Sequence, residues 1–218
     1  AELNLCEYNL KSNKKILKFR REELMNLNRI IENLKTSSIV GTTDIEISDI
    51  VYDSRKVTKN CIFVCLSGIN FDGHEFISQA IIAGAKAVIV EKDIKIAGAT
   101  IIRVENSRAA LSHISANFFG HPANKIKTVA ITGTKGKTTT SFMIKSILEE
   151  SGAKVGLIGT IGVVMGKEVI PMNNTTPESY EMHKYLRKIV ENGCKYAVIE
   201  ASSIGLARNR LDDINFDI

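Results

Sequence analysis

Hydrophobic residues along the first half of the chain form short continuous runs separated by helix-spaced sets. The runs predict buried strands at 49–52, 61–66, 87–90 and 100–104. Sets spaced by three and four residues predict helices from 27 to 34, from 76 to 83, and from Ser107 as a cap to residue 119. Gly120-His121-Pro122 then interrupts the pattern. The first half is therefore predicted to be an α/β unit with its own core.

The same alternation starts again after this break. Apolar runs at 128–132, 154–158 and 196–200 predict three more strands, and 216–218 is expected to lie in a further one. Helices are predicted from the loop after 132 to about 150, and around 182–190. Strands that alternate with helices imply a mostly parallel sheet with helices on both faces, so the predicted fold class is α/β.

Composition and charge narrow the classes of protein. With 44% hydrophobic and 24% charged residues, the 218-residue chain is typical of a folded globular protein rather than a disordered one. Six of its 29 basic residues lie in 11–21, a stretch without acids, and the remaining 23 are balanced by 24 acidic residues. We interpret 1–24 as a solvated leader or extension. Binding of nucleic acid or of an anionic membrane surface is the alternative, but 6% aromatic residues and no Trp offer no platform for stacking bases.

The cysteines and apolar runs indicate a cytoplasmic protein without membrane insertion. Cys6, Cys61, Cys65 and Cys194 form no Cys-x-x-Cys pair, and the histidines are dispersed, which argues against zinc and against a disulfide framework. No uninterrupted apolar run approaches the ~18 residues of a membrane span. The basic stretch is followed by a polar segment rather than by the apolar region of a signal peptide.

The strongest chemical signal is the segment 132–140, Thr-Gly-Thr-Lys-Gly-Lys-Thr-Thr-Thr, between a predicted strand and a predicted helix. Glycines let backbone N–H groups turn toward phosphate oxygens, a lysine neutralises phosphate charge, and the adjacent hydroxyl suits Mg²⁺. The helix that follows points its positive N-terminus at the same anion. The longer Gly-x4-Gly-Lys pattern is incomplete because Ile131 occupies the first glycine position. A plain glycine turn is the alternative, which Lys137-Thr138 makes less favoured.

Glu200 is the second signal. It ends the predicted strand 196–200 at the carboxyl edge of the sheet, where α/β proteins place ligands. Beside a phosphate loop, this carboxylate could hold a metal near Thr138, directly or through water; otherwise it is an edge glutamate.

Three spaced motifs stand out along the chain: the phosphate loop, then Asn174-Thr175-Thr176-Pro177, then Glu200-Ala201-Ser202-Ser203-x-Gly205-Leu206-x3-Arg210. Together they resemble the Mur ligases, the ATP-dependent enzymes that build the peptide stem of peptidoglycan. The first half adds Tyr52-Asp53-Ser54-Arg55 and Asp72-Gly73-His74. The second and third motifs favour the members that make the tripeptide over those that add D-Ala-D-Ala. Folylpolyglutamate synthetase has a similar phosphate loop but lacks the Asp-Ser-Arg domain.

The resemblance implies roles for individual residues. ATP would bind Gly133, Thr134, Lys135, Gly136, Lys137, Thr138 and Thr139. Lys137 would contact the transferred phosphate, and Thr138 and Glu200 would serve Mg²⁺. The UDP-MurNAc end of the substrate would be held by Tyr52 (through its backbone), Ser54, Ile69, Asn70 and Phe71. The MurNAc-dipeptide would face Asn174, Thr175, Thr176, Ser202, Arg208 and Arg210.

The implied domains are a UDP-MurNAc-binding unit at 25–122 and the first part of a central P-loop ATP-binding unit at 123–218. The implied reaction joins diaminopimelate or lysine, between which the residues do not choose, to UDP-MurNAc-L-Ala-D-Glu through an acyl phosphate. It would serve cell-wall biogenesis, and through it cell shape and division, and we expect a monomer that does not bind nucleic acid.

Two residues depart from the family pattern: Ile204 stands where a histidine is usual and Arg208 where glutamine is common. The family's carbamylated lysine, adenine pocket and third domain would lie after Ile218. We therefore expect this chain alone to be inactive as a ligase, and a non-catalytic module that binds a nucleotide or UDP-sugar is the alternative function.

Overall fold

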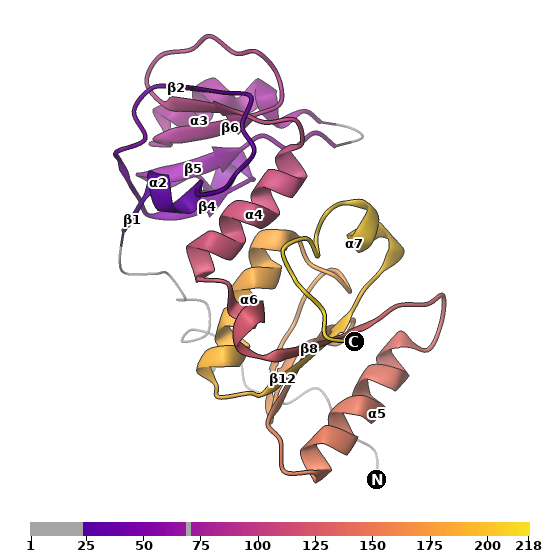
Figure 1. Ribbon diagram of the computed structural model, residues 1–218. Helices are drawn as coiled ribbons and strands as arrows, with labels where there is room; N and C mark the ends of the chain where they lie inside the picture. Colours follow the sequence, from indigo (N-terminus) through magenta and orange to yellow (C-terminus); the bar gives the residue numbers. More distant parts are fainter. Residues whose placement is uncertain (1–23, 69–70) are drawn as a thin grey trace.

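The computed structural model describes residues 24–68 and 71–218, which form two α/β units, one above the other in Figure 1. The predicted leader lies outside the described residues except for Leu24, and the division at residue 122 stays a prediction. No helix of the described part is long and apolar enough to cross a membrane.

The N-terminal unit is built on a five-stranded sheet in the order β2-β7-β6-β5-β4. The strands are β2 (Ser38–Val40), β4 (Asp49–Val51), β5 (Cys61–Val64), β6 (Ala87–Val90) and β7 (Thr100–Arg103), parallel except for β2. A small antiparallel pair joins β1 (Met25–Asn26) to β3 (Glu46–Ile47). One apolar core includes residues of α2 (Leu27–Ile30) and α4 (Ser107–Phe119), and the other includes residues of α3 (Ile77–Ile82). Both faces of the sheet are thus covered.

The second unit has a sheet in the order β11-β10-β9-β12-β8. Its parallel strands are β8 (Lys127–Ile131), β9 (Val155–Gly159) and β12 (Tyr196–Glu200), and the hairpin β10 (Gly162–Met165) and β11 (Glu168–Ile170) extends it antiparallel. Helix α5 (Lys137–Glu150) packs on one face and α6 (Ser179–Glu191) on the other. Short helix α7 (Ser203–Ala207) follows β12. Because all three parallel strands point the same way, their carboxyl ends share one edge of the sheet.

The predicted α/β class is confirmed, and several local predictions are wrong. The first helix ends at Ile30 instead of 34, and Asn33 takes a left-handed φ of 60° just beyond it. Asn106, not Ser107, caps α4 by accepting hydrogen bonds from two backbone N–H groups. Residues 216–218 form no strand, although Ala130 N–H donates to the carbonyl of Ile218 alongside β8. The β10–β11 hairpin was not foreseen from the sequence.

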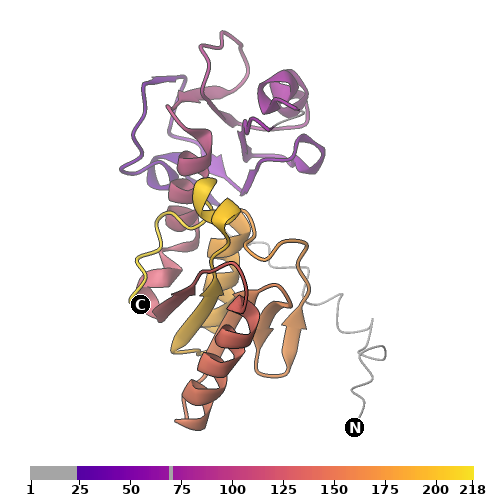
Figure 2. The same cartoon turned by 90° about the vertical axis from the view of Figure 1, so that its right-hand side faces the viewer.

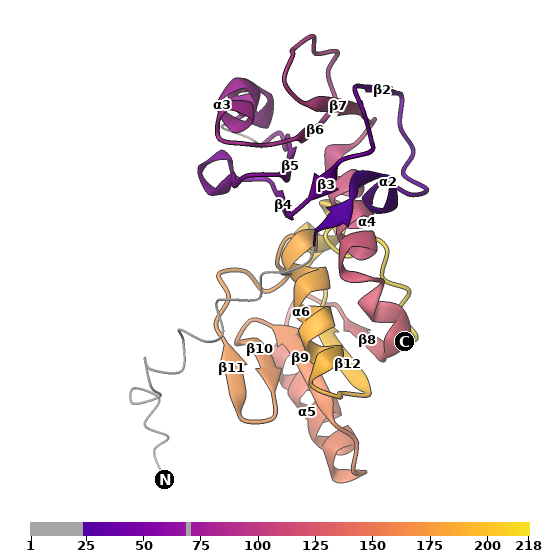
Figure 3. The same cartoon turned by 90° about the vertical axis from the view of Figure 1, so that its left-hand side faces the viewer.

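Helices α4 and α6 lie side by side and join the two units (Figures 2 and 3). Two phenol hydroxyls add hydrogen bonds across the junction: Tyr180 donates to Asp49 at 2.6 Å, and Tyr52 donates to Glu181 at 2.7 Å. Burial raises the pKa of both tyrosines and of Glu181. The phenols therefore stay protonated and act as donors, which fixes the N-terminal sheet against α6.

His183 of α6 is completely buried at this junction, close to His113 and His121 and to the last loop at Asp212 and Asp213. Desolvation lowers the pKa of its imidazole from 6.5 to about 4, against a smaller opposing effect of Asp213. The neutral ring is therefore the form compatible with the folded protein at neutral pH.

This burial predicts a pH dependence of stability. The unfolded chain takes up a proton on His183 near pH 6.5 and the folded chain only near pH 4. The free energy of unfolding should therefore fall as pH is lowered through this window, by roughly 3 kcal/mol in total. Urea titrations at several pH values measure it, and His183→Gln should remove most of the decline. Equal pH dependence in the variant and the original chain would contradict this assignment.

Candidate active site

The loop between β8 and α5 has the backbone of an anion-binding site. Gly133 has φ 142° and Gly136 has φ 80°, both in the region that favours glycine, and Gly136 is the N-cap of α5. Within the described chain no side chain caps this helix, so backbone N–H groups of its first turn are available to an anion. The loop is exposed, and Lys137 folds back so that its Nζ donates to the carbonyl of Gly133 at 2.7 Å. A cation thus lies against the loop.

Glu200 lies completely buried at the carboxyl end of β12, beside this loop. Its Oε2 accepts hydrogen bonds from Thr138 at 3.1 Å and from Thr160 at 2.9 Å, and its Oε1 accepts one from Ser141 at 3.2 Å. The three hydroxyls come from the start of α5, from its next turn and from the loop after β9. They replace the hydrogen bonds to water that the carboxylate loses on burial. Without such donors, burial of a carboxylate is strongly unfavourable.

Gly159, the last residue of β9, makes room for this carboxylate. A Cβ at Gly159 would lie 2.3 Å from Glu200 Oε1 and 2.5 Å from its Cδ, which is far inside van der Waals contact. Because Gly159 has no side chain, the carboxylate of Glu200 can approach Thr160 and the phosphate loop.

The oxygen atoms present beside the loop fit the ligand preference of a magnesium ion. Mg²⁺ prefers oxygen ligands and is usually held by one or two protein groups together with substrate phosphates and water. Thr138 offers a hydroxyl at the loop, and Glu200 offers a carboxylate hydrogen-bonded to that hydroxyl. Among the described residues no group of three or more His, Cys, Asp or Glu could hold a metal by itself. The arrangement therefore suits an ion brought in with a nucleotide.

The segment 174–176 lies next to Glu200. Thr175 shares a hydrogen bond with Thr160 at 3.1 Å, whereas Asn174 is exposed. Thr176 is buried, donates from Oγ1 to the backbone carbonyl of Glu200 at 2.8 Å, and accepts from the N–H of Ser202 at 3.0 Å. Thr176 thus ties the end of β12 to the start of α7.

The predicted dipeptide-binding residues differ in exposure. Ser202 caps α7 by accepting from the N–H of Gly205 at 3.0 Å. Arg210 is only 9% exposed, and its Nη1 donates to the carbonyl of Thr176 at 2.9 Å. Arg208 is half-buried at the C-terminal end of α7. The structure therefore brings Thr176, Ser202 and Arg210 together around the end of β12.

The residues predicted for the UDP end lie in the other unit. Ser54 begins a single 3₁₀ turn capped by Asp53, and Tyr52 precedes it with its hydroxyl bound to Glu181. Phe71 is 58% exposed, while the predictions for Ile69 and Asn70 fall outside the described residues. These positions follow β4 and β5 at the carboxyl ends of two parallel strands.

Sequence reasoning missed Ser141, Gly159 and Thr160. Ser141 is one helical turn after Thr138, so helix periodicity alone places both hydroxyls on one side of α5. The other two depend on the adjacency of β9 and β12, for which the sequence carries no local signal.

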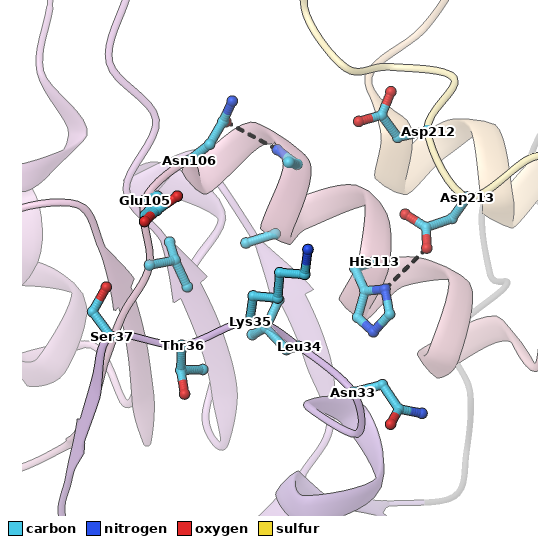
Figure 4. A pocket seen from close by; sticks show the side chains of 13 residues that line it. Asn33, Leu34, Lys35, Thr36, Ser37, Glu105, Asn106, His113, Asp212 and Asp213 are labelled. Carbon is cyan, nitrogen blue, oxygen red and sulfur yellow. Dashed lines mark hydrogen bonds and ion pairs between the residues drawn. The ribbon is translucent and has the colours of Figure 1, made fainter.

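A separate cavity of about 480 Å³ lies between the N-terminal loop 33–37, α4 and the last loop (Figure 4). Two of its lining residues, His113 and Asp213, form a hydrogen bond of 2.9 Å between Nδ1 and Oδ1. None of the residues predicted for the site lines this cavity.

A parallel strand, a glycine loop, a helix and a carboxylate at the neighbouring strand end are the features typical of P-loop units, and this one is fused to a second α/β unit. The comparisons with known proteins agree. The profile described as the Mur ligase middle domain matches residues 131–218, and that described as the Mur ligase family, catalytic domain, matches residues 46–119. The chain belongs to the Mur ligase family.

Its relatives include two ligases named UDP-N-acetylmuramoyl-L-alanyl-D-glutamate–2,6-diaminopimelate ligase. The one from Clostridioides difficile (strain 630) is 42% identical over 194 residues, covering 89% of this chain and 40% of that protein. The one from Clostridium perfringens (strain 13 / Type A) is 43% identical over 194 residues, covering 88% and 40%. The chain thus spans about 40% of the length of these relatives.

Solved structures support the fold. A UDP-N-acetylmuramoyl-L-alanyl-D-glutamate–2,6-diaminopimelate ligase matches with a TM-score of 0.73 and 22% identity, covering 89% of this chain and 39% of that one. The MurF ligase from Thermotoga maritima in complex with ADP matches with a TM-score of 0.50 and 28% identity, covering 71% and 32%.

The close approach of Gly159 to Glu200 predicts the cost of a single methyl group. Gly159→Ala should lower the free energy of unfolding by about 1–3 kcal/mol, because the new Cβ must displace a buried carboxylate and its three donors. Denaturant titration measures this, with Ala153→Ser, just before β9, as a mild control. An alanine variant as stable as the original chain would show that Glu200 does not occupy this position.

Proposed function

We propose that this chain forms the nucleotide-sugar-binding and ATP-binding parts of a ligase that adds diaminopimelate to UDP-MurNAc-L-Ala-D-Glu in peptidoglycan synthesis. The observation that carries the proposal is the buried Glu200 beside Thr138 and the Gly133–Gly136 loop, in a chain about 42% identical to ligases of that name. Diaminopimelate is preferred over lysine because the similar proteins carry it in their names. Because the chain spans about 40% of the length of those proteins, we do not ascribe the complete reaction to these 218 residues by themselves.

The chemistry would proceed in two steps. The terminal carboxylate of D-Glu attacks the γ-phosphorus of ATP, and ADP leaves, giving an acyl phosphate. The amine of diaminopimelate then attacks the acyl carbon, and phosphate leaves as the amide bond forms. Phosphoryl transfer of this kind depends on positioning and on neutralising charge.

Residues of this chain would position the phosphates and neutralise their charge. Lys137 lies over the loop and can exchange its contact with the Gly133 carbonyl for a phosphate oxygen, while the first-turn N–H groups of α5 face the same anion. When bound at Thr138 and Glu200, Mg²⁺ would neutralise negative charge on the phosphates. Glu200 also orients the hydroxyls of Thr138 and Thr160, which fixes the mouth of the site.

The substrate would span both units. Its UDP end is proposed to bind Ser54, the backbone at Tyr52 and the 69–71 segment, and its dipeptide Asn174, Thr175 and the Ser202–Arg210 region. This assignment follows the family resemblance and is supported by the placement of Thr175 and Ser202 around the end of β12. Because the proposed substrates are ATP and a UDP-linked sugar, we propose that the enzyme acts in the cytoplasm.

Removing the loop lysine tests the ATP site. Lys137→Ala should weaken Mg·ATP binding at least about tenfold, because a hydrogen bond to a charged group contributes about 1.5–3 kcal/mol. Its melting temperature should change little, since Lys137 is only half-buried, next to the exposed residues 132–136. Calorimetric titration measures the affinity, and Lys167→Ala in the exposed β10–β11 turn is the control. Equal ATP affinity in Lys137→Ala and Lys167→Ala would refute the proposed site.

A further inference from the structure

Glu178 occupies the N-cap position of α6 without capping the helix. Its backbone is extended, with φ −61° and ψ 156°, and its side chain accepts no hydrogen bond from the helix N–H groups. Glutamate is not among the residues favoured for capping, which are Ser, Thr, Asp and Asn. The side chain is 15% exposed and turns to two arginines instead. Helix formation therefore does not account for this carboxylate.

The first arginine is Arg210, which the proposed function places at the dipeptide. Its Nη2 lies 2.5 Å from Glu178 Oε1, and its Nη1 donates to the carbonyl of Thr176 at 2.9 Å. Its buried Nε has no hydrogen-bond partner in the described part of the chain. Because arginine presents its donors in one rigid plane, fixing both Nη groups fixes the direction of the whole guanidinium.

The second arginine is Arg108, from the first turn of α4 in the N-terminal unit. Its Nη1 lies 3.4 Å from Glu178 Oε2, and its Nη2 donates to the carbonyl of Ser67 at 3.3 Å. Ser67 immediately precedes the Gly68 that leads into the 69–71 segment. One carboxylate thus links Arg210, proposed to face the dipeptide, with Arg108 of the N-terminal unit.

We infer that Glu178 is a positioning residue that holds Arg210 in place for the dipeptide and ties it, through Arg108, to α4 of the N-terminal unit. This inference rests on the proposed function. Pre-ordering matters because immobilising a flexible arginine side chain on binding costs conformational entropy. With Glu178 in place, Arg210 is ordered before the substrate arrives.

The decisive measurement compares two ligands in calorimetric titrations of the 218-residue chain. The first is UDP-MurNAc-L-Ala-D-Glu and the second is UDP-MurNAc, which lacks the dipeptide. Glu178→Gln keeps the shape of the side chain and removes its charge. We expect it to weaken binding of the first ligand about tenfold and of the second by less than about threefold, with Mg·ATP affinity unchanged. A general loosening of the two units would weaken both ligands alike.

Tyr180→Phe is the matched control, because it removes another hydrogen bond between the units, to Asp49, and touches neither arginine. It should lower the melting temperature without separating the two ligands. Should Glu178→Gln fail to fold, Glu178→Asp places a favoured residue at the N-cap, and its shorter side chain draws the carboxylate away from Arg210, so it should produce the same difference between ligands.

The outcomes separate the two proposals. A chain without substitutions that binds neither UDP ligand would overturn the proposed function, and this inference with it. Binding of both ligands with equal losses, or with no loss, in Glu178→Gln or its Glu178→Asp substitute would overturn the positioning role alone.

Discussion

The buried carboxylate of Glu200 is the interaction on which the site depends. Its position requires a strand end, three hydroxyl donors from two other segments and a glycine on the adjacent strand, all at once. Since an unpaired carboxylate cannot be buried cheaply, the donors must stay in place as long as the protein is folded. The carboxylate therefore fixes the start of α5 against β9 and β12, and with it the phosphate loop.

The second constraint is the junction of α4 and α6. Phenol–carboxylate hydrogen bonds and the packed rings of Phe119 and Tyr180, 5.3 Å apart, hold the N-terminal sheet on the helix that covers the sheet of the second unit. Glu178 begins this helix and contacts α4, so the junction is continuous with the proposed substrate site. The same packing that stabilises the two units also determines how far apart their proposed ligand-binding edges lie.

Much of this arrangement could be predicted from the sequence because it is local. The phosphate loop, its flanking strand and helix, and Glu200 at a strand end all lie in continuous motifs, and strand β12 begins and ends where predicted, at Tyr196 and Glu200. Thr160 and Gly159 were missed because their roles arise only when β9 pairs with β12. Arg210 was assigned from a motif, but its bond to Glu178 depends on the fold around α7 and was invisible in the sequence. Long-range pairing, rather than local propensity, separates what was predicted from what was not.

If Glu200 and Thr138 hold Mg²⁺ as proposed, ATP binding at this loop should depend on that ion. The most direct test is the affinity for ATP with and without Mg²⁺, in the original chain and in Glu200→Gln, which keeps the size of the buried side chain. We predict that Mg²⁺ strengthens ATP binding by about tenfold in the original chain and has little effect in the variant, whose Mg²⁺-free affinity stays similar. The same Mg²⁺ enhancement in Glu200→Gln as in the original chain would contradict this claim.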